Sequence, residues 1–232
     1  MAKRIIVPSK TAKSDLIRNE GVKAKKIIVI PYGYDFELYP SPQQNFILKE
    51  KDKHKEQIIL GVILRLCAAK KVEHTILVLE KLLQSNQSAF LYIVSDGPEK
   101  KFLENLVSEK KLNKNIEFVG NTDNVINYLS IIDFLLHPSI AESSNQVIKE
   151  AGLVNKPVIV CKGIGDFDEY LVDGYNAFLV NKESFVEETF NIIIENKNYK
   201  KKLNLIGENL HKTIINRFSI NKAMTIYQLL IA

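Results

Sequence analysis

Cysteine is scarce in this sequence, and long apolar runs are missing. Only Cys67 and Cys161 occur among the 232 residues, with no CxxC and no His–Cys spacing. A disulfide framework or a structural zinc site is therefore not expected, and a reducing, cytoplasmic setting fits best. No apolar run approaches the roughly 18 residues of a membrane span. The run "IIV" near the N-terminus ends at Pro8, too early for a signal peptide.

Charge of one sign does not dominate either. The sequence has 32 Lys and Arg residues against 27 Asp and Glu residues, for a net charge of +5. Lysines gather in "ILKEKDKHKE" and "NYKKKLN", beside glutamate or asparagine, which is typical of solvated faces. Because aromatic residues do not alternate with these basic runs, nucleic acid is not expected as a partner. Peripheral contact with an anionic surface, at the inner face of a membrane, stays open.

Two nucleotide-binding signatures are absent as well. The sequence holds no GxxxxGK followed by Ser or Thr, and no GxGxxG. The first absence disfavours a P-loop nucleotide hydrolase, and the second disfavours a dehydrogenase with a dinucleotide cofactor. The composition, 46% apolar and 25% charged, nevertheless suits a globular domain.

What is present is a regular alternation of short apolar runs and amphipathic segments. Strands of this kind, nearly continuous in apolar character, predict an α/β fold with a Rossmann-like parallel sheet and helices on both faces. In such a fold ligands bind at the carboxyl ends of the strands. From Phe185 onward the apolar spacing is helical, as expected for core packing. The predicted strands are 58–64, 89–97, 115–120, 133–139, 157–162 and 177–180. The first three predicted helices between them are 72–83, 99–111 and 123–132.

The first 45 residues do not fit into this alternation. "RIIVPS" and "KIIVIPYGYD" predict two strands joined by the helix "TAKSDLIRNEG", and one such unit cannot bury its own sheet. We therefore interpret residues 1–45 as the remnant of a second Rossmann-like domain, 46–57 as a linker and 58–232 as the main domain with C-terminal helices.

Charged residues follow the predicted strands at three places. Arg65 and Lys70 come directly after the first strand of the main domain, and a guanidinium with an ammonium suits a pyrophosphate. From the spacing alone, two surface cations remain the simpler interpretation. His137 precedes Pro138 at another strand end, and a lone histidine there is more often packed than catalytic.

Two glutamates eight positions apart, Glu142 and Glu150, form the third place. If Glu142 lies in a loop and a helix begins near Ser144, the first free amides of that helix would point at an anion. Glu150 would then lie within hydrogen-bond reach of a ribose. The alternative, an amphipathic helix with two exposed glutamates, stays equally open.

These pieces occur in one order: Arg65, Lys70, "SDGP", "FVG", "HPSIAES…KEAG" and "VDGYNAFLV". Together they resemble the C-terminal, donor-binding half of the group 1 (family 4) retaining glycosyltransferases, which have two facing Rossmann-like domains (the GT-B fold). The resemblance implies transfer of a sugar from a UDP-, GDP- or ADP-type nucleotide sugar to an acceptor hydroxyl, with retention. The expected pathways are synthesis of polysaccharide, lipopolysaccharide or other glycoconjugates.

The resemblance also implies roles for individual residues. Arg65, Lys70 and Glu142 would be the catalytic set, with the two cations on the donor diphosphate and Glu142 on the donor sugar. No metal or other cofactor is expected, because the cations neutralise the departing diphosphate. The expected donor-nucleotide site consists of Arg65, Lys70, Gly120, Asn121, Asn145, Gln146, Val147 and Glu150.

Departures from the family's pattern concern mainly glycine. Family members often carry glycine where this chain has Leu64, Lys71, Ser95, Asn145 and Ala177. We expect the side chains of Leu64 and Asn145 to crowd the phosphates.

The resemblance further implies an N-terminal, acceptor-binding domain of which only residues 1–45 are present here. We expect that segment to pack against the last helix, and the chain alone to be inactive. The partners would be a nucleotide sugar, a glycan or lipid-linked acceptor, and the N-terminal domain in cis or as a separate subunit. Two alternatives stay open: a non-catalytic subunit of a split glycosyltransferase, or half of a sugar-nucleotide epimerase.

Overall fold

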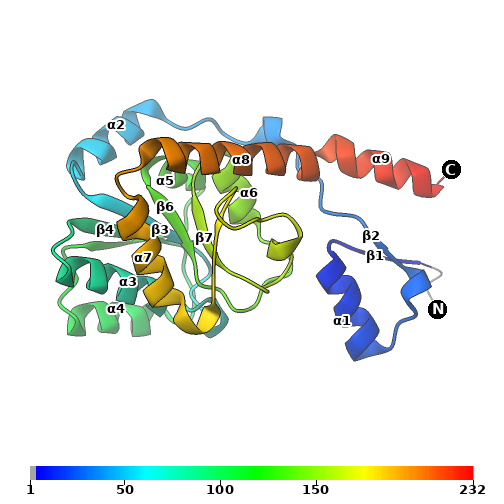
Figure 1. Cartoon of the computed structure of the whole chain (residues 1–232), viewed down its shortest axis with the longest axis horizontal. Coiled ribbons are helices and arrows are strands. Elements are labelled where there is room, and N and C mark those ends of the chain that lie inside the picture. Colours follow the sequence, from blue (N-terminus) through cyan, green and yellow to red (C-terminus); the bar gives the residue numbers. More distant parts are fainter. Residues whose placement is uncertain (1–3, 232) are drawn as a thin grey trace.

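A six-stranded parallel sheet with helices on both faces forms the centre of the computed structural model, which describes residues 4–231 (Figure 1). The strand order is β5-β4-β3-β6-β7-β8, so the predicted α/β fold is confirmed. The chain runs from β3 outward to β5 and then returns to the other side of β3. The sheet therefore has a switch point between β3 and β6, where crevices form at the carboxyl ends. The strands are β3 (Ile58–Ile63), β4 (Ala89–Val94), β5 (Ile116–Gly120), β6 (Phe134–His137), β7 (Val158–Cys161) and β8 (Phe178–Val180).

The strands are apolar on both faces because both faces are covered. Leu60 belongs to the hydrophobic cluster on one face and its neighbour Ile59 to the cluster on the other, as the two-residue period of a strand requires. All six residues of β4 are buried. The covering helices are α3 (Glu73–Gln84), α4 (Lys100–Glu109), α5 (Val125–Ile131), α6 (Gln146–Leu153), α7 (Phe185–Asn196) and α8 (Lys200–Phe218).

The segment interpreted as a linker contains a helix, α2 (Gln44–Lys53), which is a correction. Phe46 of α2 packs on Tyr128 of α5, with ring centroids 5.2 Å apart. The Gln43 amide donates to Asn127 Oδ1 over 2.8 Å and so fixes the entry to α2. Because lysines fill the exposed face of α2, its short apolar stripe did not stand out in the sequence.

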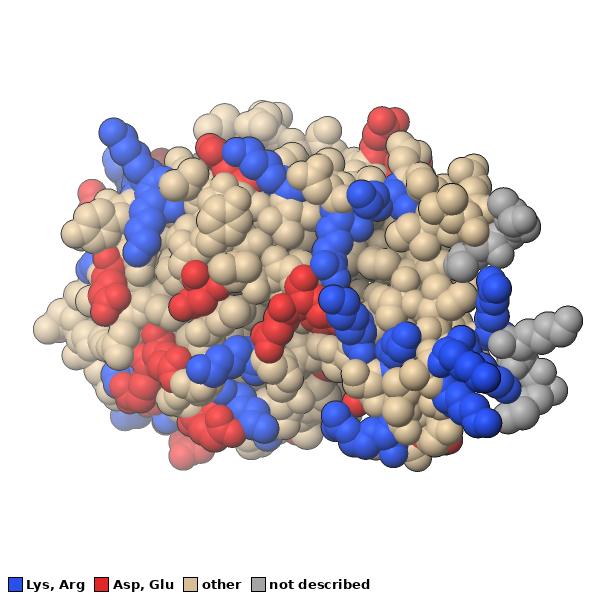
Figure 2. Space-filling model, turned by 45° about the vertical axis from the view of Figure 1, so that its right-hand side comes forward, with Lys and Arg blue, Asp and Glu red and all other residues tan. Residues whose placement is uncertain are grey.

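A small unit precedes α2 and lies beside the main sheet (Figure 1). Strands β1 (Ile5–Val7) and β2 (Ile27–Val29) form a two-stranded parallel sheet joined by α1 (Lys10–Glu20). Ser9 caps α1 by accepting from the Ala12 amide, and Gly21 ends it in the left-handed conformation. Figure 2 shows Lys and Arg side chains gathered on this side of the molecule.

The N-terminal unit is tied to the C-terminal helices at one point, where α8 meets α9 (Ile220–Ile231). Tyr34 donates its amide to Phe218 O over 2.7 Å and accepts from the Ile220 amide over 2.9 Å. Gly33 lies so close to α9 that an added Cβ would be 2.7 Å from Ala223 Cβ. The expected packing against the last helix is therefore confirmed for residues 33–34.

Within residues 4–231, no helix combines the length and the apolar character needed to cross a bilayer.

Candidate functional site

Arg65 is held outward by the buried leucines on either side of it. Leu64 and Leu66 are 6% and 0% exposed, while Arg65 itself is exposed. Leu66 is fixed by backbone bonds to the next strand's loop: its amide donates to Asp96 O, and its carbonyl accepts from the Glu99 amide, both over 3.0 Å. No hydrogen bond or ion pair engages the Arg65 guanidinium within the described chain. The loop therefore presents a free cation at the carboxyl end of β3.

The expected crowding by Leu64 stays a prediction, since Leu64 lines the same cavity of about 240 Å³ as Arg65. Its side chain belongs to the hydrophobic cluster on the α3 and α4 face of the sheet. Because successive residues of an extended chain point to opposite sides, burying Leu64 is what turns Arg65 outward.

Lys70 and Glu142 form an ion pair at the start of this crevice. Lys70 Nζ lies 2.6 Å from Glu142 Oε1 and 2.9 Å from Ala141 O. The same carboxylate oxygen lies 2.9 Å from His137 Nε2. Lys70, from the loop after β3, and His137, at the end of β6, thus meet at the Glu142 carboxylate.

The environment of Glu142 sets its charge. Burial acts to raise the pKa of this carboxyl, but hydrogen bonds from His137, Lys70 and Ser139 outweigh burial and lower the pKa to about 2. Burial lowers the pKa of His137, which is 0% exposed. A neutral His137 with its proton on Nε2 donates to Glu142 and packs its ring edge against Phe167. His137 is thus a packed residue, as its place in sequence suggested, and it also orients Glu142.

The helix predicted near Ser144 begins at Gln146, so Glu142 lies in the preceding loop. Asn145 is its N-cap, and its side chain accepts from the Ile148 amide over 3.3 Å. That bond makes the Asn145 side chain a helix cap, and its expected crowding of the phosphates stays a prediction. The amides of Gln146 and Val147 precede any intrahelical acceptor and, with the helix dipole, favour an anion.

Glu150 lies one turn further along α6. Gln146 Nε2 donates to Glu150 Oε1 over 2.8 Å. Glu150 lines a cavity of about 500 Å³ with Tyr39 and Thr122. Burial raises the pKa of this carboxyl.

Four of the predicted residues line cavities, namely Arg65, Asn121, Glu142 and Glu150, and the other five line none of these three cavities. Arg65 and Asn121 line one of about 240 Å³, and Thr122 and Asp123 line both this cavity and the cavity of Glu150. Gly120 ends β5 at φ 77°, and its carbonyl accepts from the Ser95 amide at the rim. Glu142 faces a third cavity of about 540 Å³, whose opposite wall comes from α1. The structure thus gathers the predicted residues along one edge of the sheet, and their roles remain predictions.

A buried cation beneath this edge was missed from the sequence. Lys149 is 0% exposed, and its Nζ lies 3.4 Å from Asp166 Oδ2, 3.2 Å from Tyr170 Oη and 3.3 Å from Ser144 Oγ. Burial lowers the pKa of Lys149 to about 8, against the opposing attraction of Asp166. The available signal was a lysine inside a short helix whose other residues from Val147 to Gly152 are mostly apolar and buried on several sides.

Two of the substituted glycine positions have the backbone that glycine favours. Lys71 has φ 50° and Ser95 has φ 122°. An L-residue near φ 120° is strained, at a cost of about 1–3 kcal/mol. At these two positions the backbone therefore has a conformation that glycine adopts more readily than the residue present.

Replacing Ser95 by glycine is therefore expected to raise the free energy of unfolding by about 1 kcal/mol, measured by urea denaturation. Within the described part of the chain, the substitution removes one side-chain hydrogen bond, the 3.5 Å approach of the Ser95 hydroxyl to Asn121 Oδ1. Ser85→Gly is the control, because Ser85 has φ −89° and the change there should destabilise. Equal losses for both variants would refute the strain at Ser95.

Among the residues that the structure describes, no three His, Cys, Asp or Glu side chains converge in a way that would hold a metal ion.

Comparison with known families agrees with this geometry. The family described as "Glycosyl transferases group 1" matches residues 43–220, and the chain belongs to this family. Among curated proteins it is similar to an alpha-monoglucosyldiacylglycerol synthase from Acholeplasma laidlawii, 26% identical over 81% of this chain and 48% of the relative. It is also similar to the N-acetyl-alpha-D-glucosaminyl L-malate synthase of Bacillus anthracis, 24% identical over 94% of this chain and 58% of that protein.

Solved structures show the same fold. Anabaena HepE, crystallised with UDP and glucose, superposes with a TM-score of 0.87 at 24% identity, over 100% of this chain and 64% of HepE. Sucrose-phosphate synthase from Thermosynechococcus elongatus gives a TM-score of 0.84 at 22% identity, over 99% of this chain and 58% of that one. The chain thus spans about half the length of the curated relatives described above.

Proposed function

We propose that this chain is the donor-binding half of a glycosyltransferase that acts in glycoconjugate or polysaccharide synthesis. Membership of the group 1 family supports the reaction class. The observation that carries the proposal is the arrangement along one sheet edge: a free Arg65, the Lys70–Glu142 pair and the N-terminus of α6. Similarity to the UDP-Gal:alpha-D-GlcNAc-diphosphoundecaprenol alpha-1,3-galactosyltransferase of Escherichia coli supports a nucleotide-sugar donor and a lipid-linked or glycan acceptor.

In this proposal the cations and the α6 amides bind the donor diphosphate. Arg65 gives a two-pronged contact and Lys70 a point charge, while the amides of Gln146 and Val147 bind the other phosphate oxygens. Glu150 accepts from the ribose hydroxyls. Gly120 and Asn121, at the end of β5, face the base, and Asn145 keeps the α6 terminus in place.

Transfer in the proposed mechanism breaks the bond between the anomeric carbon and the diphosphate oxygen and forms one to the acceptor oxygen. The negative charge that grows on the diphosphate is stabilised by Arg65 and Lys70, with no metal ion. Attack on the leaving-group face gives retention, and the acceptor proton passes to the departing diphosphate. Glu142 stays ionised through the neutral pH range because its pKa is about 2, so it binds donor-sugar hydroxyls and takes up no proton.

The domain arrangement is part of the same proposal. Residues 1–45 are the end of an acceptor-binding domain, and residues 58–232 form the donor domain, with α2 between them. The wall that α1 contributes to the Glu142 cavity supports this, since it closes the crevice from the side where an acceptor would enter. The chain alone is expected to bind donor and to transfer no sugar until the rest of the acceptor domain is supplied.

Thermal unfolding with UDP, GDP, ADP and their common sugars tests the proposal. Ligand at about a hundred times its dissociation constant adds about 2.7 kcal/mol, which raises the melting temperature of a domain of this size by roughly 5–10 °C. Glu150→Ala should abolish most of that shift. Glu195→Ala, an exposed glutamate of α7, should keep it. If none of the nucleotides raises the melting temperature, the proposed donor site is wrong.

A further inference from the structure

A further polar cavity lies at the opposite end of the sheet, where the strands begin. It has a volume of about 500 Å³, and its wall includes Ile58, Phe134 and Pro157, at or next to the starts of β3, β6 and β7. Helix α2 and the first turn of α8 complete the wall. This cavity shares no lining residue with those of the proposed donor site.

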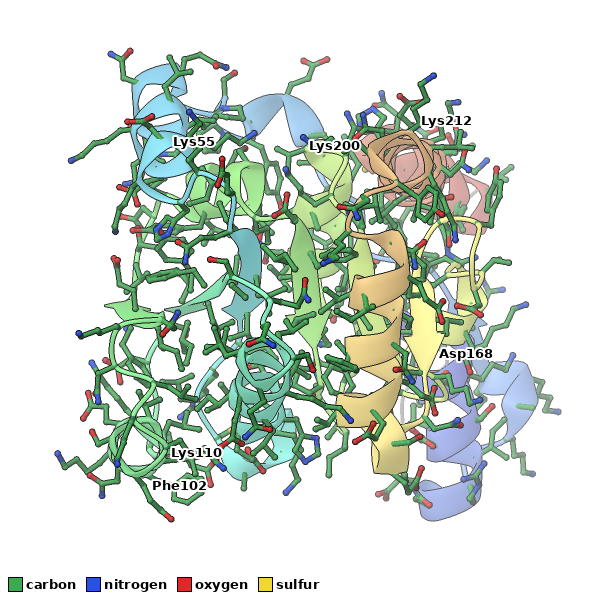
Figure 3. The ribbon with its side chains drawn as sticks, turned by 60° about the vertical axis from the view of Figure 1, so that its left-hand side comes forward. Lys55, Phe102, Lys110, Asp168, Lys200 and Lys212 are labelled. Atoms are coloured by element: carbon green, nitrogen blue, oxygen red, sulfur yellow. The ribbon has the colours of Figure 1, made fainter. Side chains whose placement is uncertain are left out.

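Cations outnumber carboxylates in the wall of this cavity. Four lysines and two carboxylates line it: Lys51, Lys156, Lys197, Lys200, Glu56 and Asp133. Lys51 comes from α2, Lys156 from the loop before β7, and Lys200 begins α8, where Figure 3 labels it. The lysines therefore converge from three separate elements.

Three of these lysines form no ion pair within the described part of the chain, although Asp133 lies near them. Lys51, Lys156 and Lys200 all act electrostatically on Asp133, yet none forms an ion pair or side-chain hydrogen bond with the described part of the chain. Asp133 is already engaged, since its Oδ2 accepts from the Ile59 amide over 2.8 Å. The wall of the cavity thus carries more cationic than anionic groups, and one carboxylate cannot pair with all of them.

This arrangement disfavours the charged form of Lys156. Burial and the repulsion of Lys51 lower the pKa of its ammonium to about 8, although Asp133 opposes them. An anion between these ammonium groups would remove the repulsion. The uncapped N-terminus of α8, where Tyr199 offers no side-chain acceptor, adds amide donors on the same side.

We propose that this cavity binds a phosphate-bearing anion, a phosphate monoester or diphosphate, at a site separate from the donor site. Lys156 contacts the phosphate from the cavity wall, and Lys51 of α2 and Lys200 of α8 contact it from the other elements. The same chemistry is offered by a free phosphorylated compound and by the phosphate headgroup of an anionic lipid.

Calorimetric titration with inorganic pyrophosphate tests the site. Pyrophosphate would also enter the donor site, so the titration is made in the Arg65→Met background. Binding is expected to persist there and to weaken about ten-fold or more when Lys156→Met is added, as for loss of a charge-assisted hydrogen bond. Lys212→Gln, an exposed lysine further along α8 (Figure 3), is the matched control and should leave the affinity unchanged. Equal affinity with and without Lys156, or no pyrophosphate binding in the Arg65→Met background, would overturn the proposal.

Two further experiments distinguish a lipid headgroup from a free phosphorylated compound, and this site from the donor site. Co-sedimentation with phosphatidylcholine vesicles containing phosphatidic acid, dependent on Lys156, assigns a lipid headgroup. Pyrophosphate binding without co-sedimentation assigns a free phosphorylated compound. The nucleotide-induced rise in melting temperature should be the same in Lys156→Met as in the wild type, so the donor-site proposal and this one fail independently.

Discussion

Replacing Lys149 by methionine is expected to lower the free energy of unfolding by about 4 kcal/mol. The ammonium of Lys149 is fully buried, 3.4 Å from Asp166 and above the rings of Tyr170 and Phe218 at 4.8 and 4.6 Å. Removing one partner of a buried ion pair leaves the other charge unpaired, which typically costs 3–5 kcal/mol. Urea denaturation followed by circular dichroism measures the loss.

Two further variants separate charge pairing from packing at this place. In the double variant Lys149→Met/Asp166→Leu no lone charge remains, so most of the lost stability should return. Lys110→Met removes a half-exposed pair with Glu80 (Figure 3 labels Lys110) and should cost less than about 1 kcal/mol. If the double variant is less stable than Lys149→Met, the buried pair is not what stabilises this region.

Arg65→Met is expected to weaken nucleoside diphosphate binding by about a hundred-fold or more and to leave the unliganded stability unchanged. The guanidinium is exposed and makes no ion pair with described residues, so its removal breaks no contact within the fold. Two charge-assisted hydrogen bonds to a diphosphate would be lost, and bonds of this kind contribute about 1.5–3 kcal/mol each.

Isothermal titration with UDP and with uridine checks this. The variant should bind UDP more weakly than the wild type and should bind uridine equally well, since Arg65 is proposed to contact only the diphosphate. Lys55→Met removes an exposed lysine away from the crevice (Figure 3) and should bind UDP like the wild type. An unchanged UDP affinity in Arg65→Met would exclude this residue from the site.

Strand positions were predictable because the sheet is covered on both faces. A strand such as β4, buried along its whole length, leaves a continuous apolar run that no surface helix would show. Helix α2 was missed for the opposite reason. Its lysines face solvent, and its burial depends on Phe46 meeting Tyr128, a contact between distant parts of the sequence.

The site was predictable only as a set of positions after strands. Their order along the chain indicated Arg65, Lys70 and Glu142, because carboxyl ends of parallel strands share one edge. The sequence did not reveal that His137 would share the Glu142 carboxylate, or that Lys149 would lie beneath the loop at Ser144. Both contacts depend on side-chain directions that three-dimensional packing fixes, and spacing does not encode them.

A crystal structure of the chain with a nucleoside diphosphate would test the central claim most directly. The account predicts the diphosphate between Arg65, Lys70 and the α6 amides, with the ribose hydroxyls on Glu150. A nucleotide bound elsewhere, with Arg65 and Glu150 free of it, would contradict the account.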